Sequence, residues 1–101
     1  MATFGIVQRF PGGTREQYEN VVEVVHPDGG KALPEGQLLH LAGPTGDGWL
    51  VLTVHESRDS WGRFRDDTLM PGLASVDDGL PGPPEEMTFD VEVFQTRQRT
   101  A

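Results

Sequence analysis

The order in which two kinds of hydrophobic periodicity follow one another constrains the fold of this chain most strongly. Residues 3–10 alternate apolar side chains with others, as a half-buried strand does, and a Pro-Gly-Gly sequence then ends the run. An apolar stripe at helical spacing follows over residues 18–25. Because Thr14 and Gln17 form a capping-box pattern, a helix is predicted to begin at Thr14.

Four further elements follow in the order strand, strand, helix, strand. Residues 36–42 and 49–56 predict two strands joined by a Gly-rich hairpin, and Ser57 or Asp59 can cap a second helix. A proline near the end of this helix cannot donate a backbone hydrogen bond, so the helix is expected to kink or restart there. After a Gly/Pro-rich connector, residues 87–96 alternate again and predict a fourth strand.

This βαββαβ order predicts a single α+β domain of ferredoxin-like type over residues 1–101, with both helices on one face of a four-stranded antiparallel sheet. The positions assigned to the helix side are Phe4, Ile6, Gln8, Phe10, Leu38, His40, Leu50, Leu52, Val54, Phe89, Val91 and Val93. Those assigned to the open side are Val7, Arg9, Leu39, Leu41, Trp49, Val51, Thr53, His55, Asp90, Glu92 and Phe94. The open set is too apolar for water and predicts a partner. The reverse assignment of the two faces also fits the pattern.

Charge and length narrow the choice of partners. The net charge of −8 repels nucleic acid, and no apolar run approaches the roughly 20 residues of a membrane span. No basic stretch followed by an apolar one marks a secretory signal near the first residue, so we expect a soluble cytoplasmic protein. The chain has no cysteine, which excludes thiolate chemistry and disulfides. With 101 residues the core is expected to be thin, which favours a homodimer.

Three stretches carry a resemblance to a known family. Residues 36–45 read GQLLHLAGPT, residues 48–57 read GWLVLTVHES, and the aromatic pair of Trp61-x-x-Phe64 follows. With these stretches the whole chain resembles the dimeric α/β-barrel superfamily, including its antibiotic-biosynthesis-monooxygenase-like branch, in which two sheets face each other as a barrel. That branch often carries a histidine after the glutamate that ends its third strand, where this chain has Arg65 and Asp66.

The resemblance implies a small cofactor-independent enzyme, monooxygenase-like or cyclase-like, that acts on a hydrophobic aromatic molecule in a pocket between sheet and helices. The superfamily also contains haem-degrading enzymes and proteins of unknown role, and the fold alone does not choose among them. The alternative is therefore a non-catalytic small-molecule-binding or accessory barrel protein.

His40 is the candidate catalytic residue. Apolar neighbours disfavour its charged form, so it can act as a neutral base. A core histidine satisfied by one hydrogen bond would have the same sequence surroundings. Gln8 is expected to orient the substrate. The other candidate substrate-binding residues, which ordinary core packing also explains, are Tyr18, Trp61, Phe64 and Met70.

The remaining candidates concern the dimer and metals. Trp49, Thr53, His55 and Phe94 are expected at the homodimer interface. His26 is predicted to interact with the terminal carbonyls of the first helix. The three histidines lack the spacing of metal ligands, so neither a metal site nor a cofactor is predicted.

Overall fold

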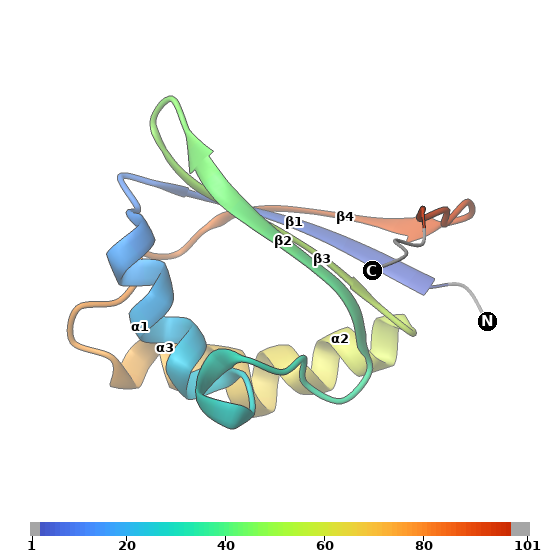
Figure 1. Ribbon diagram of the computed structural model, residues 1–101, viewed down its shortest axis with the longest axis horizontal. Helices are drawn as coiled ribbons and strands as arrows, with labels where there is room; N and C mark the ends of the chain where they lie inside the picture. The colour runs from blue at the N-terminus through green and yellow to red at the C-terminus, as the bar shows by residue number, and fades with distance from the viewer. Residues whose placement is uncertain (1–2, 98–101) are drawn as a thin grey trace.

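The computed structural model describes residues 3–97, which form an antiparallel sheet with helices packed on one of its faces (Figure 1). The elements in chain order are β1 (Thr3–Pro11), α1 (Arg15–Val25), η1 (Asp28–Gly30), β2 (Gln37–Thr45), β3 (Gly48–His55), α2 (Arg58–Phe64), η2 (Arg65–Leu69), α3 (Met70–Ser75) and β4 (Glu85–Val91). The four strands lie in the order β2-β3-β1-β4. The predicted βαββαβ order is confirmed, and the architecture is compatible with a ferredoxin-like fold.

Both long helical segments begin at a side-chain cap. The Gln17 backbone N–H donates to Thr14 Oγ1 at 3.2 Å, and the Thr14 backbone N–H donates to Gln17 Oε1 at 3.0 Å. The predicted capping box is confirmed. At the start of α2, the Ser60 backbone N–H donates to Ser57 Oγ at 3.0 Å, so Ser57, rather than Asp59, is the cap.

The second helical segment continues past its proline. The turns of α2, η2 and α3 follow one another without a break, and η2 is π-helical. The Met70 backbone N–H donates to the Arg65 carbonyl, which lies five residues earlier. A proline lacks an N–H and crowds the carbonyl four residues before it, and a π-helical turn changes this spacing. The interruption expected at Pro71 is therefore a wider turn just before it.

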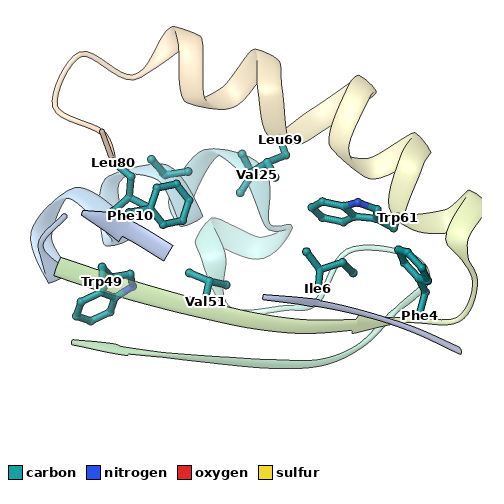
Figure 2. Close-up of a cluster of buried hydrophobic side chains, with 10 residues drawn as sticks. Phe4, Ile6, Phe10, Val25, Trp49, Val51, Trp61, Leu69 and Leu80 are labelled. Carbon is teal, nitrogen blue, oxygen red and sulfur yellow. The ribbon is translucent and has the colours of Figure 1, made fainter. Parts of the chain in front are cut away.

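The apolar core fills the space between the sheet and the helices (Figure 2). Its buried members are Phe4, Ile6, Phe10, Val21, Val25, Trp49, Val51, Trp61, Leu69 and Leu80. Tyr18, Phe64, Leu73 and Val76 pack against this cluster and are partly buried. Every strand residue in the cluster comes from β1 or β3, the two central strands.

The face assignment is confirmed for β1 and wrong for β3. The aligned pairs of the two strands include Phe4 with His55, Ile6 with Thr53, Gln8 with Val51 and Phe10 with Trp49. Directly opposed residues of an antiparallel pair share a face. The β3 residues that lie under the helices are therefore Trp49, Val51, Thr53 and His55, and those on the open face are Leu50, Leu52 and Val54. Five of the six residues from Trp49 to Val54 are apolar, so alternation could not distinguish the two faces.

The assignment is also wrong for β4. Thr88 pairs with Ile6 and Phe89 with Gly5, so Phe89 and Val91 lie on the open face. The helix-side residues of β4 are Glu86, Thr88 and Asp90. All three are exposed, which explains why this side of the strand is polar. The strand ends at Val91, so Glu92, Val93 and Phe94 follow it instead of belonging to it.

Candidate functional site

A chain of side-chain hydrogen bonds runs between the sheet and the helices. Its members, in order, are Tyr18 of α1, His40 and Gln37 of β2, His55 of β3 and Ser60 of α2. The Tyr18 hydroxyl lies 2.5 Å from His40 Nε2, and His40 Nδ1 lies 2.9 Å from Gln37 Oε1. Gln37 Nε2 lies 3.3 Å from His55 Nε2, and His55 Nδ1 lies 3.0 Å from Ser60 Oγ. The hydrogen-bonded chain joins four elements, α1, β2, β3 and α2.

A β-bulge in β2 makes the middle of this chain. Residues three apart in a regular strand point to opposite faces. The register shifts between Gln37 and Leu39, so that Gln37 pairs with His55 while His40 pairs with Thr53. Gln37 and His40 therefore share the helix-side face. The extra residue, Leu38, is 46% exposed, so its assignment to the helix side is wrong.

The far end of the chain depends on a glycine. Gly36 has a φ of +84°, a conformation that favours glycine. A Cβ at this position would also collide with Ser60 Oγ. Ser60 is buried, and its backbone is held by the Ser57 cap. The glycine before the bulge thus lets Ser60 approach His55, whose side chain is fully buried.

Burial keeps the histidines neutral. Desolvation lowers the pKa of His40 to about 4, with a smaller contribution from the neighbouring His26. Desolvation also lowers the pKa of His55 to about 4, and it lowers the pKa of His26. The His26 ring meets the His40 ring edge-on, with 4.7 Å between centroids. Burial raises the pKa of Tyr18, and Glu19 raises it further. At neutral pH the hydrogen-bonded chain of side chains therefore contains one phenol, Tyr18, and uncharged imidazoles.

The space inside the core is too small for an aromatic substrate. It has a volume of about 40 Å³, and Gln8, Tyr18, His40, Trp61 and Phe64 are among the residues that line it. Ligand pockets usually measure roughly 300–1,000 Å³. The inner cavity therefore suits a water molecule or a small group rather than a ring system.

A larger groove opens at the β2 edge of the sheet, with a volume of about 370 Å³. We call it the edge groove, and it is lined by Arg15, Tyr18, Glu19, His40, Ala42, Gly43, Pro44 and Trp49. Tyr18 and His40 line both the inner cavity and this groove. The edge groove therefore has room for a small organic molecule and gives it access to Tyr18 and His40, at one end of the hydrogen-bonded chain.

A groove larger than the edge groove lies elsewhere, between α2, η2 and the helix side of β4. It has a volume of about 610 Å³, and its charged lining residues are Arg58, Asp59, Arg63, Arg65, Asp66, Asp67 and Glu86. Arg65 already donates to Asp66, at 2.9 Å. Because its charges are mixed, this groove favours neither an anionic nor a cationic ligand, and no histidine is among its lining residues. Size alone is therefore not a reason to select this groove as the candidate site.

The structure brings together some of the predicted site residues. Tyr18 and His40 are bonded to each other, and Trp61 and Phe64 wall the inner cavity. Gln8 lines the same cavity, but its Nε2 donates to Glu86 Oε1 at 3.0 Å and not to His40. Met70 is 50% exposed and lines neither the cavity nor the edge groove.

The predicted interface residues do not share a surface. Thr53 and His55 are buried under the helices, and Trp49 is a core residue that also lines the edge groove. Phe94 is exposed beyond the end of β4. The assignment of Trp49, Thr53 and His55 to the open face is wrong, because that face of β3 carries the alternate residues of the strand.

Sequence reasoning did not identify Gln37 or Ser60. The one local signal is Gly36, a conformational marker that precedes the bulge.

Within residues 3–97, no group of three or more His, Asp or Glu side chains could hold a metal ion. No helix in the same range is long and apolar enough to cross a membrane. Comparison with known protein families finds no match, and comparison with curated proteins finds none either.

Proposed function

We propose that the chain is a cofactor-independent enzyme, monooxygenase-like or cyclase-like, that removes a proton from a hydrophobic aromatic molecule bound in the edge groove. One observation carries the proposal: the Tyr18 hydroxyl is bonded to a neutral imidazole, and both groups line a groove of substrate size. A neutral imidazole at pH 7 is a base without first losing a proton. Ala42, Pro44 and Trp49 supply apolar surface for a ring.

The proton moves through Tyr18 in this mechanism. The phenol oxygen accepts the acidic proton of the substrate while the phenol's own proton passes to His40 Nε2. The substrate becomes an anion and His40 becomes an imidazolium, so charge and protons balance. A ketone anion stabilised by aromatic rings can then transfer electrons to O2, or attack a carbonyl of the same molecule and close a ring. The imidazolium finally returns its proton to the product.

Anthrone, a tricyclic ketone with an acidic methylene group, tests the oxygenase form of the proposal. Anthrone and one O2 give anthraquinone and one water, so oxygen uptake and quinone absorbance report the same reaction. We expect the wild-type protein to accelerate it, and Tyr18→Phe and His40→Gln each to lower kcat by about 10²- to 10⁴-fold. Ser75→Ala, which removes a bond to the Gly72 carbonyl in α3, is the matched control. Equal rates in all four proteins would contradict the proposal.

A non-catalytic binding or accessory role is the second candidate. Its support is that both nitrogens of His40 already have partners, so of these two residues only Tyr18 has a free lone pair for a ligand in the groove. Saturable anthrone binding without oxygen uptake, measured by fluorescence titration, would favour this role over the enzyme.

We also propose that a second copy of the chain covers the open face of the sheet, as in a dimeric α/β barrel. The face carries apolar side chains on all four strands, and an ion pair of Arg9 and Glu85 lies at one end of it. The apolar members include Val7, Leu39, Leu41, Leu50, Leu52, Met87, Phe89 and Val91. Leu41 is 55% exposed, Met87 62% and Phe89 44%. A continuous apolar surface of this kind usually marks an interaction site. The absence of a side chain at Gly5 leaves space for the Phe89 ring on this face, since a Cβ there would collide with the ring.

Charge placed on the open face should separate the copies. We expect the wild-type protein to have twice the chain mass in native mass spectrometry, and Leu41→Lys with Phe89→Lys to give mostly monomer. Burying a lysine charge without a partner is costly, whereas an exposed lysine is not. The matched control is Val24→Lys, because Val24 is equally exposed but lies on α1. A monomeric wild-type protein, or a double variant that stays dimeric, would rule out this interface.

A further inference from the structure

The hydrogen-bonded chain contains enough information to assign the tautomer of each histidine in it. A neutral imidazole has one nitrogen that donates and one that accepts, so its partners decide which is which. Gln37 Oε1 can only accept, and it faces His40 Nδ1. The proton of His40 is therefore on Nδ1, and Nε2 accepts from the Tyr18 hydroxyl. Gln37 Nε2 donates to His55 Nε2, which places the His55 proton on Nδ1, where it is donated to Ser60 Oγ.

The two ends of the chain favour this direction over its reverse. Rotating the Gln37 amide by half a turn would reverse every donor and acceptor while keeping each bond. Tyr18 would then accept and Ser60 would donate. A phenol, with an ordinary pKa of about 10, is a stronger donor and a weaker acceptor than an aliphatic hydroxyl. The 2.5 Å contact between Tyr18 and His40 Nε2 is at the short limit expected for an O–H donor.

We propose that Gln37, His55 and Ser60 are positioning residues that hold His40 in the Nδ1–H tautomer and so keep Nε2 as the proton acceptor next to Tyr18. Gln37 acts directly on His40. His55 fixes the orientation of the Gln37 amide, and Ser60 fixes that of His55. The catalytic consequence rests on the proposed function, because the other tautomer would present an N–H to Tyr18 and could not take its proton. The tautomer itself does not depend on any substrate.

Nitrogen NMR of the ¹⁵N-labelled protein, without ligand and at pH 7.5, measures the tautomer directly. Two-bond correlations from the ring carbons' protons distinguish a protonated from an unprotonated nitrogen, and a His40→Gln spectrum assigns the signals. We expect His40 and His55 each to show a protonated Nδ1 and an unprotonated Nε2. A protonated Nε2 on His40 in the wild-type protein would overturn the proposal.

Three variants test the part played by Gln37 and its neighbours. Gln37→Leu removes the acceptor for Nδ1, and we expect most of the His40 population to change to the Nε2–H form. Ser60→Ala removes the acceptor at the far end, and we expect a partial change at both histidines. The matched control is Gln8→Leu, because Gln8 is also a buried glutamine on the helix-side face but bonds to Glu86. An unchanged His40 signal in Gln37→Leu would overturn the positioning role.

Gln37→Glu keeps the experiment decisive if the leucine variant does not fold. A carboxylate presents an acceptor to both histidines, so His40 should keep its proton on Nδ1 while His55 moves its proton to Nε2. An unchanged tautomer at His55 would contradict the proposed donor-to-acceptor direction of the hydrogen-bonded chain. The anthrone assay is independent of these spectra. Correct tautomers without turnover would leave the positioning intact and reject the enzyme, whereas turnover with the wrong tautomer would do the reverse.

Discussion

Acidification from pH 7 to about pH 4 should lower the free energy of unfolding by about 3 kcal/mol through His55 alone. Burial lowers the pKa of this residue from 6.5 to about 4, and each pKa unit corresponds to about 1.4 kcal/mol. The unfolded chain takes up the proton near pH 6.5, whereas the folded chain does so only near pH 4. The stabilisation is therefore fully present above about pH 6.5 and is lost as the pH falls through this window. His40 shifts in the same direction and adds to the loss.

Urea unfolding at half-unit pH intervals measures this effect. The lowered pKa values of Asp47 and Asp66, each caused chiefly by an arginine partner, act only at lower pH, since their ordinary value is 3.8. The change in the free energy of unfolding between pH 6.5 and 4.5 is thus attributed to the histidines. His55→Gln should be less stable at pH 7 and should have a shallower pH dependence. A wild-type stability that is constant from pH 7 to pH 5 would show that the histidines are hydrated in the folded protein.

Replacement of Trp61 by alanine should destabilise the protein by about 3–5 kcal/mol, the usual cost of truncating a buried aromatic side chain. Trp61 is 3% exposed and lies between α2 and the β1 side chains of Phe4 and Ile6 (Figure 2). Its ring centroid is 5.6 Å from that of His55 and 6.1 Å from that of Phe64. For a domain of this size the loss should lower Tm by more than about 10 °C.

Thermal unfolding followed by circular dichroism checks this result, with Trp61→Phe as the conservative comparison. The phenylalanine variant should lose much less, because it keeps most of the apolar surface. The truncation also admits water next to His55, so the alanine variant should show a weaker pH dependence of stability than the wild type. A loss below about 1 kcal/mol in Trp61→Ala would mean that the core closes over the missing ring.

The sequence was sufficient for the element order because each element carries its own local signal. The capping box of Thr14 and Gln17 predicted the start of α1, and the structure contains both of its hydrogen bonds. The register of β3 could not be predicted in the same way. Its apolar residues fit either face, and the polar side chains of Thr53 and His55 suggested an exposed side. Burial of His55 depends on Gln37 and Ser60, which lie on other elements.

The candidate site was predicted only as separate residues. His40 was a candidate base because of its apolar surroundings, and Tyr18 was a candidate wall residue. Their contact depends on how α1 crosses the edge of the sheet, which periodicity does not determine. Gln37 was missed because a regular strand would point it away from His40, and only the bulge reverses this. The pocket between sheet and helices that the resemblance implies is only a small cavity, because the aromatic side chains pack in and against the core, which was the alternative explanation for them.

The chain from Tyr18 to Ser60 also determines which substitutions can accumulate together. Loss of one member leaves a buried polar neighbour without its partner, at about 1–3 kcal/mol, whereas replacing a bonded pair by apolar groups of similar shape can be nearly neutral. Mutations at Gln37 and His55 should therefore be non-additive, because either one alone already removes the bond between them. Any lineage that abandons the chemistry is expected to lose these residues as a group, so their joint presence or joint loss would separate active from inactive relatives.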